Sequence, residues 1–221
     1  MPEKRSAQNA VVRPGSAEEL RAATRVFADA FRSEGFTSWM FDLSSPEKQA
    51  RLARANDLVL TLRREKGQEF LVAVIDEEIV GMAVVNAPNS KNSVSFWRQA
   101  RIALPRLPDL MAMLSLIRWR RAWPAKKAAQ PPKTLPDHYH TLEALAVAPA
   151  HQGQGIGRLL LEATHAISDA DPQSAGIYLY TADERNRAIY ERFGYELVEQ
   201  RVGGEALTVY HMFRPQRAPS A

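Results

Sequence analysis

The 221-residue sequence contains no cysteine. Disulfide bridges, thiolate metal sites and an acyl-cysteine intermediate are therefore excluded. Long apolar runs are also missing, because no window approaches the roughly 18 residues that indicate a membrane-spanning helix. The N-terminal residues 1–10 are polar and lack the apolar core of a secretory signal. We therefore expect a cytoplasmic protein with no membrane span.

An excess of one charge is missing too, because 29 lysines and arginines stand against 25 acids. A net charge of +4 is too modest to indicate a nucleic-acid partner by itself. The composition, 45% apolar and 24% charged, is typical of a globular protein with one well-buried core. We expect a disordered tail over residues 1–9, a single domain over residues 10–214 and a second tail over residues 215–221.

The most informative stretch of the sequence is Leu142–Ile167. The apolar run Leu142–Val147, closed by Pro149, predicts a strand in the interior of a sheet. From Ile156 onward the apolar side chains follow helical spacing. The turn between them holds Gly153, Gly155 and Gly157. Glycines let a backbone approach a ligand closely, and the following helix points free N–H groups at the same place. The stretch therefore predicts an anion site that suits a phosphate or pyrophosphate.

Two common phosphate motifs do not fit these glycines. A dinucleotide fingerprint requires a third glycine where this chain has Arg158, and a nucleoside-triphosphate loop requires a following Lys-Ser or Lys-Thr. The pattern present is Q-x-x-G-x-G, over residues 152–157. With the preceding L-A-V-x-P strand and the leucines that follow, it resembles the acetyl-CoA loop of the GCN5-related N-acetyltransferases (GNAT). A strand–turn–helix corner with three structural glycines is the alternative interpretation.

A second segment strengthens this resemblance. Residues 183–195 are similar to the second GNAT motif, N-x-x-A-I-Y-E-x-x-G-[FY], and follow the first motif in the expected order. The resemblance implies that Asn186 binds the pantetheine or its phosphate and that Tyr190 protonates the departing thiolate. Elementary chemistry also supports this role of Tyr190, because a phenol of reference pKa about 10 stays protonated at neutral pH and can donate to a thiolate of pKa near 8.5. An ordinary packed tyrosine is the alternative.

The resemblance also implies how acetyl-CoA is bound. Its pyrophosphate is expected on the loop 152–158, and its pantetheine is expected to pair with the edge of the preceding strand. A strand amide, for which we choose that of Val147, is expected to stabilise the oxyanion. The residues implied in binding acetyl-CoA are Leu145, Ala146, Val147, Gln152, Gly153, Gln154, Gly155, Ile156, Gly157, Arg158 and Asn186.

Glu143 is a carboxylate inside the apolar strand, and burying it unpaired is costly. By alternation it shares a strand face with Leu145 and Val147. One interpretation is a salt bridge to an arginine of the insertion described below. The other is a general base that takes the proton of the acceptor's ammonium, directly or through water, with desolvation raising its pKa. His138 and His140 with Glu143 give no complete ligand set at strand spacing, so we expect no metal.

Residues 87–136 interrupt the order of elements, and their apolar positions suggest one or two helices. From Arg98 to Lys133 there are nine lysines and arginines against one acid, Asp109, so this segment carries +8 and the rest of the chain −4. Three interpretations are open. The segment is a lid over the acceptor pocket, a surface for an acidic membrane or nucleic acid, or a solvated insertion with a homodimer face. The lid is favoured because the insertion directly precedes the strand of the first motif.

The N-terminal part of the chain predicts a strand, two helices and a hairpin, in that order. This matches the opening of the fold that the resemblance implies: α/β, with a mixed, mostly antiparallel twisted sheet flanked by helices and a helical insertion before the motif strand. In that fold the loop Phe36–Met40 builds the acceptor pocket, although its aromatic residues equally suit a core. The candidate pocket residues are Phe36, Trp39, Phe96 and Trp97.

The predicted function is an N-acetyltransferase that moves the acetyl group of acetyl-CoA directly onto a primary amine of a small molecule, with Glu143 and Tyr190 as catalytic residues. A protein or peptide N-acetyltransferase and a non-catalytic acyl-CoA- or nucleic-acid-binding module are the alternatives. The basic insertion and the ending Tyr210–Pro215 are also similar to the puromycin N-acetyltransferase group. The strand of that group lacks a carboxylate at the position of Glu143.

Overall fold

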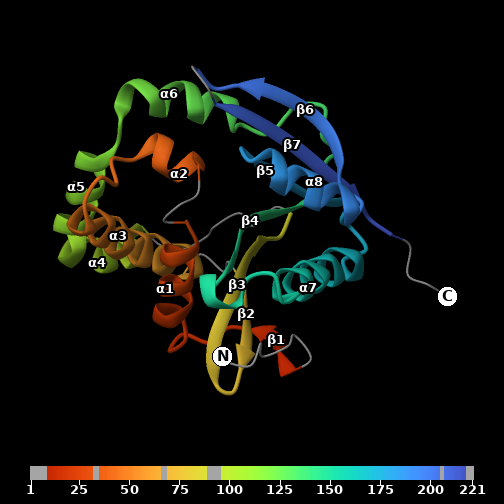
Figure 1. The fold of residues 1–221 in the computed structure, drawn as a ribbon, viewed down its shortest axis with the longest axis horizontal. Helices are drawn as coiled ribbons and strands as arrows, with labels where there is room; N and C mark the ends of the chain where they lie inside the picture. The colour runs from red at the N-terminus through yellow and green to blue at the C-terminus, as the bar shows by residue number, and fades with distance from the viewer. Residues whose placement is uncertain (1–8, 32–34, 66–68, 89–95, 205–206, 218–221) are drawn as a thin grey trace.

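The computed structural model describes residues 9–31, 35–65, 69–88, 96–204 and 207–217 (Figure 1). It contains a seven-stranded sheet. The strands are β1 (Val11–Pro14), β2 (Glu69–Ile75), β3 (Glu78–Asn86), β4 (His140–Val147), β5 (Gly176–Thr181), β6 (Glu196–Val202) and β7 (Thr208–Pro215). Their order across the sheet is β1-β2-β3-β4-β5-β7-β6. Every neighbouring pair is antiparallel except β4 and β5, which are parallel. The expected mixed, mostly antiparallel sheet is confirmed.

Helices cover both faces of this sheet. They are α1 (Leu20–Phe31), α2 (Gly35–Met40), α3 (Pro46–Glu65), α4 (Phe96–Ala103), α5 (Leu107–Leu116), α6 (Trp119–Ala128), α7 (Ile156–Ala170) and α8 (Glu184–Arg192), with short 3-10 turns at Leu104–Arg106 and Pro149–His151. Two predictions need correction. The expected loop at residues 36–40 is the helix α2, and the insertion forms three helices rather than one or two. No described helix combines the length and the apolar character that crossing a membrane requires.

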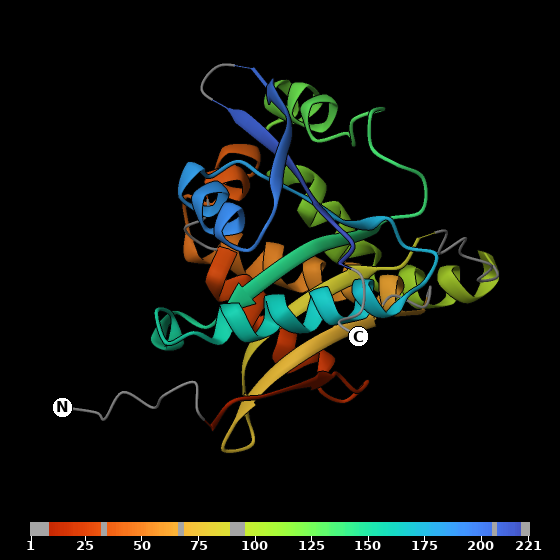
Figure 2. The same cartoon turned by 90° about the vertical axis from the view of Figure 1, so that its right-hand side faces the viewer.

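The core lies on the two faces of the central strands. Figure 1 shows α1 and α3 on one side of β3 and β4 and α7 on the other, and Figure 2 shows α7 lying alongside β4. On the α7 side, Leu160 and Tyr195 are almost fully buried, and on the α1 side Val26 and Leu60 pack against the sheet. Each such side chain stabilises the fold by about 1.5–3 kcal/mol through burial. The central strands are therefore held rigidly from both faces.

A β-bulge interrupts β4 at Glu143. The register of β4 against β3 passes from Ala144, opposite Val84, to Leu142, opposite Val85, and so skips Glu143. Leu142 and Leu145 consequently pack in the same core cluster although they are three residues apart. The simple alternation that placed Glu143 on the face of Leu145 is therefore wrong. Bulges bend a strand and re-aim a side chain, and they are frequent next to active sites.

The parallel strands β4 and β5 pair only near their starts and then diverge. The register contains two pairs, His140 with Ile177 and Thr141 with Tyr178. Beyond these pairs, the edge of Leu145–Val147 that faces β5 has no strand partner among the described residues. Such an edge presents a row of backbone N–H and C=O groups that an extended ligand can pair with.

The insertion packs on the helical side of the molecule. Helices α4 and α5 contact α3, and α6 contacts α2. Backbone hydrogen bonds join the end of α2 to the α5–α6 junction: the Arg118 N–H donates to the Met40 carbonyl at 3.0 Å, and the Asp42 N–H donates to the Leu116 carbonyl at 2.8 Å. The insertion thus braces α2 from outside.

Candidate active site

A cavity of about 610 Å³ lies where β4 and β5 diverge. Helices α1, α2 and α3 form one wall, and β4, β5 and α8 form the other. Segments far apart in the sequence therefore meet at one place. The predicted site residues that line the cavity are Phe36, Glu143, Leu145, Ala146, Val147, Gln152, Asn186 and Tyr190.

The glycine turn leads from β4 into α7. Gly153 (φ +74°) and Gly155 (φ +85°) have left-handed backbone conformations that disfavour any side chain. Gly155 is the N-cap of α7, and no side chain caps this end of the helix. The first-turn N–H groups therefore have no partner within the helix and are available to an anion. A Cβ at Gly157 would make only ordinary contacts, so that glycine is not required by backbone strain.

Two glutamine side chains hold this turn in place. Nε2 of Gln152 donates to the Val147 carbonyl at 3.1 Å, and Nε2 of Gln154 donates to the Ala150 carbonyl at 3.2 Å. The side chain of Arg158, in the first turn of α7, is 62% exposed and lies 3.7 Å from Glu162. Such an exposed pair contributes little to stability, so the guanidinium can turn to a ligand at small cost.

The N–H of Val147 points to the open side of β4. The next residue, Ala148, donates its N–H to the Val80 carbonyl at the end of β3. Because successive peptide groups of a strand point in opposite directions, the Val147 N–H faces the region where β5 has diverged. This orientation suits a donor to a ligand in the cavity.

Tyr190 lies on α8, opposite the β4 edge. Asp183 caps this helix by accepting a hydrogen bond from the Arg185 N–H at 2.8 Å. The Tyr190 ring makes an edge contact with Tyr195, with 5.5 Å between the ring centroids. Burial raises the pKa of Tyr190 to about 12. The phenol therefore keeps its proton throughout the physiological pH range and faces the cavity as a donor.

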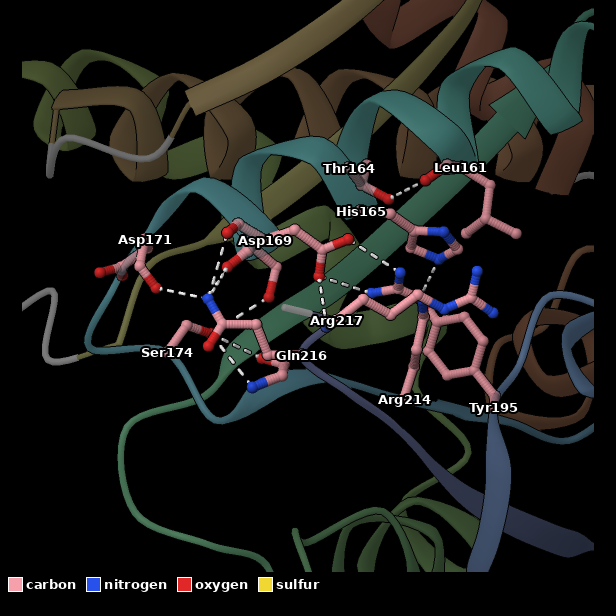
Figure 3. A network of polar contacts seen from close by, with 12 residues as sticks. Leu161, Thr164, His165, Asp169, Asp171, Ser174, Tyr195, Arg214, Gln216 and Arg217 are labelled. Carbon is pink, nitrogen blue, oxygen red and sulfur yellow. Dashed lines mark hydrogen bonds and ion pairs between the residues drawn. The ribbon is translucent and has the colours of Figure 1, made fainter. Parts of the chain in front are cut away.

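A buried polar network supports Tyr195 and through it Tyr190 (Figure 3). Nε2 of His165 lies 3.1 Å from the Tyr195 hydroxyl. Burial, assisted by the nearby Arg214 guanidinium, lowers the pKa of His165 to about 4, so the imidazole is neutral. Arg214 in turn makes two hydrogen bonds to Asp169, at 2.9 and 2.8 Å. These contacts fasten β7 to α7 and fix the side of the cavity that carries Tyr190.

Glu143 faces the cavity, but it is exposed rather than buried. Its carboxylate accepts a hydrogen bond of 2.7 Å from Nδ2 of Asn86, the last residue of β3. The prediction of a desolvated carboxylate is therefore wrong. The physical reason is the bulge, which turns Glu143 out of the strand's interior face.

The predicted acceptor residues separate into two groups. Phe36 lines the cavity and makes an edge contact with Tyr180 of β5, with 6.1 Å between the ring centroids. Trp39 instead packs towards α6, where the Arg121 guanidinium lies 5.7 Å from its ring centroid. The side chains of Phe96 and Trp97 lie outside the described residues.

The insertion contributes nothing to the cavity lining within the described part of the chain. The lid interpretation therefore finds no support there. Met40, the last residue of the predicted acceptor loop, also lines the cavity. Sequence reasoning missed several other residues that do so, namely Phe41, Asn56, Tyr180 and Ile189. Phe41 adjoins the predicted loop, whereas Asn56 and Tyr180 lie in ordinary amphipathic elements that give no separate signal.

Comparison with known proteins finds a family model that matches part of the chain. Residues 128–197 match the family model described as an acetyltransferase (GNAT) domain, and this span includes the glycine turn and all of α8. No curated protein matches the chain.

Several solved structures share the fold. One is the histone acetyltransferase HPA2 and related acetyltransferase from Corynebacterium glutamicum, with 20% identity over 97% of this chain and 100% of that chain and a TM-score of 0.66. An N-acetyltransferase from Staphylococcus aureus Mu50 has 13% identity over 95% and 100%, with a TM-score of 0.55. A chain of the NatC complex bound to Gag peptide and CoA has 14% identity over 95% and 100%, with a TM-score of 0.50. Residues 128–197, which contain both motifs, thus match a GNAT acetyltransferase domain, and the whole chain shares its fold with solved acetyltransferases.

Proposed function

We propose that this chain transfers the acetyl group of acetyl-CoA directly onto a primary amine of a small molecule. The observation that carries the proposal is the cavity between β4 and β5, because one space is lined by the open strand edge, by Tyr190 and by Glu143. An acyl donor, a proton donor and a carboxylate for the acceptor can meet there.

Acetyl-CoA fits the features of the β4–α7 region. Its pyrophosphate would bind the free N–H groups of the first turn of α7, where Gly155 gives close access and Arg158 adds positive charge. Its pantetheine would lie along Leu145–Val147 and occupy the place from which β5 has diverged. Asn186, on the facing helix α8, would bind the same arm.

The reaction then needs three groups of this chain. The amine nitrogen attacks the thioester carbon, a C–N bond forms and the C–S bond breaks. The Val147 N–H stabilises the oxyanion of the tetrahedral intermediate. Glu143 takes the ammonium proton through water, since its carboxylate is exposed.

Tyr190 stabilises the departing thiolate by donating a hydrogen bond to it. With a pKa of about 12, the phenol is a weaker acid than an ordinary thiol of pKa near 8.5. Complete proton transfer is therefore favoured only to the extent that the same burial also raises the pKa of the leaving thiol. A strong hydrogen bond to the developing charge lowers the barrier in either case.

The size of the cavity favours a small acceptor. Its volume of about 610 Å³ lies within the roughly 300–1,000 Å³ of small-molecule sites. Helices α2 and α3 wall its acceptor side, where an extended peptide would require an open groove.

The test is to incubate the protein with acetyl-CoA and a panel of small primary amines and peptides, measuring free CoA and the N-acetyl product by mass spectrometry. We expect turnover with small amines. Acetylation of peptides alone would instead support a protein N-acetyltransferase, and CoA binding without any turnover would support a non-catalytic module.

A further inference from the structure

We infer that the acceptor of this site carries one ammonium group on an uncharged, largely apolar body. The inference rests on the proposed acetyl transfer and names the chemical class of its acceptor. Three observations carry it: the charge of the cavity lining, its aromatic character, and a second cavity directly beside the first.

The lining contains a single charged side chain among the described residues, that of Glu143. The remaining polar contributions from the helical wall are neutral, and they come from Thr37 and Asn56. One carboxylate matches one ammonium group. A second cation further inside would have no opposite charge to replace its hydration, and a carboxylate would have no cation there.

The helical wall is rich in apolar and aromatic side chains. Its lining residues include Phe27, Phe36, Met40, Phe41, Leu52 and Val59. The edge contact between Phe36 and Tyr180 closes this wall against β5. Flat rings and a flexible methionine suit an apolar or aromatic body, because such surfaces gain free energy when they leave water.

A second cavity, of about 220 Å³, adjoins the acceptor side. The two cavities share Thr37, Leu52 and Asn56 in their linings, so the smaller one lies directly beside the larger one between α2 and α3. Its described lining carries no charged side chain, and Gln49 adds one further neutral amide. The body of the acceptor can therefore extend past Asn56 without meeting a charge.

A matched set of amines tests the inference through kcat/KM. Hexylamine, 1,6-diaminohexane and 6-aminohexanoate share a six-carbon chain and differ only in the far group, which is apolar, cationic or anionic. We expect hexylamine to exceed each of the other two at least tenfold, even though the diamine offers two reactive ends. 4-Phenylbutylamine should equal or exceed hexylamine. A diamine or amino acid within twofold of hexylamine would overturn the inference.

A change of charge in the cavity lining tests the same inference from the side of the protein. Asn56→Asp introduces a carboxylate where the two cavities meet, and we expect the ratio of kcat/KM for the diamine to that for hexylamine to rise at least tenfold. Gln173→Glu, the same chemical change in the exposed turn after α7, should leave that ratio unchanged. An unchanged ratio in Asn56→Asp would contradict the assigned path of the acceptor.

Calorimetry of the same amines with the protein–CoA complex separates the two proposals. Preferred binding of hexylamine without turnover of any amine would leave the acceptor class standing and defeat the proposed acetyl transfer. Turnover of the amines without discrimination by charge would leave the proposed acetyl transfer standing and defeat the acceptor class. Binding that favours the diamine, or shows no preference, would overturn the acceptor class whether or not turnover occurs.

Discussion

The motif region, residues 140–195, and the insertion, residues 87–136, have similar lengths but different roles in the structure. The motif region places backbone groups and a phenol around one cavity, and its helix α7 buries Leu160 and Leu161 in the main core. The insertion leaves much of its apolar surface in solvent: of the twelve large hydrophobic side chains that are exposed in the described part of the chain, six lie between Leu104 and Trp123. The residues predicted to take part in catalysis thus lie where the local sequence dictates the backbone geometry. The insertion affects the rest of the molecule through its packing contacts.

The attachments of the insertion are few and specific. His211, fully buried in β7, donates from Nε2 to the Ala128 carbonyl at the end of α6, at 2.7 Å. Its Nδ1 must then be the acceptor, so the Tyr178 hydroxyl donates to it at 2.7 Å. Burial lowers the pKa of His211, which is consistent with this neutral tautomer. His211 therefore joins the insertion to the sheet with both ring nitrogens engaged, beside the Arg201 guanidinium, which donates to the Gln130 carbonyl at 2.7 Å, and the apolar cluster of Ala125, Ala128, Leu207 and Val209.

The largest expected effect lies in the motif region. Tyr190→Phe should lower kcat about 100-fold, because it removes the donor to the leaving thiolate. The dissociation constant of CoA, measured by calorimetry, should change less than threefold, since the ring remains. A kcat within threefold of the parent protein would show that the phenol is only a packing residue.

Replacing His211, which contacts both the insertion and the sheet, should lower the stability of the fold rather than the catalytic activity. His211→Ala leaves the Ala128 carbonyl and the Tyr178 hydroxyl without their partner, and we expect a loss of about 2–4 kcal/mol in the free energy of unfolding. Tyr178→Phe, which removes one of the two bonds, should cost less. Urea denaturation measures both variants, and a loss below about 0.5 kcal/mol in His211→Ala would remove this contact from the account.

The free energy of unfolding should decrease as the pH is lowered, because of the buried His165 in the polar network behind Tyr190. His165 has a folded-state pKa of about 4, against about 6.5 in the unfolded chain. The unfolded state therefore binds more protons between these values, so stability is complete above pH 6.5 and is lost as the pH falls towards 4. We expect a loss of about 2 kcal/mol between pH 6.5 and 5 from this residue. His140 and His211, whose pKa values burial also lowers, act in the same direction.

Urea denaturation across this pH range checks the expectation. His165→Gln keeps a polar side chain but removes the titration, and it should flatten the dependence. Equal stability at pH 5 and pH 7 in the parent protein would mean that the buried histidines are not held neutral.

The glycine turn should show a smaller effect. Gly155→Ala places a side chain on a left-handed backbone, a cost of about 1–2 kcal/mol, and should weaken CoA binding roughly tenfold. Gly157→Ala is the matched control, because its Cβ would make only ordinary contacts. Equal losses of affinity in the two variants would indicate contact with the ligand rather than backbone strain.

The smallest effect is expected on the outer face of α6. Trp119 and Trp123 are 62% and 76% exposed. The double change to serine should alter the free energy of unfolding by less than about 1 kcal/mol, and kcat by less than twofold. A large loss of activity would revive a direct role of the insertion in catalysis.

The sequence predicted the elements whose local pattern is self-sufficient. The apolar run of β4, the glycines with positive φ and the spacing of α7 each carry their own signal, and all three elements are confirmed. The bulge at Glu143 could not be found in this way, because it depends on the register with β3. Strand alternation alone therefore predicted the wrong environment for this carboxylate.

The acceptor side was harder to predict for a related reason. Asn56 of α3 and Tyr180 of β5 line the same cavity as Glu143 only because the fold brings these elements together, and amphipathic spacing does not reveal which helix residues face a cavity. Trp39 and Phe36 looked equivalent in the sequence, and both pack against the same apolar cluster, but only Phe36 also lines the cavity. The roles of all the site residues, and the narrower likeness to the puromycin group, stay predictions.

Acetyl-CoA labelled with ¹³C in its acetyl group tests the central claim most directly. The protein should be incubated with it first alone and then with hexylamine, and the label followed by mass spectrometry in both the protein and the amine. Direct transfer predicts an unlabelled protein throughout, with one labelled amide formed for each CoA released. A labelled protein that passes its acetyl group to the amine, or CoA release with the label recovered only as acetate, would contradict it.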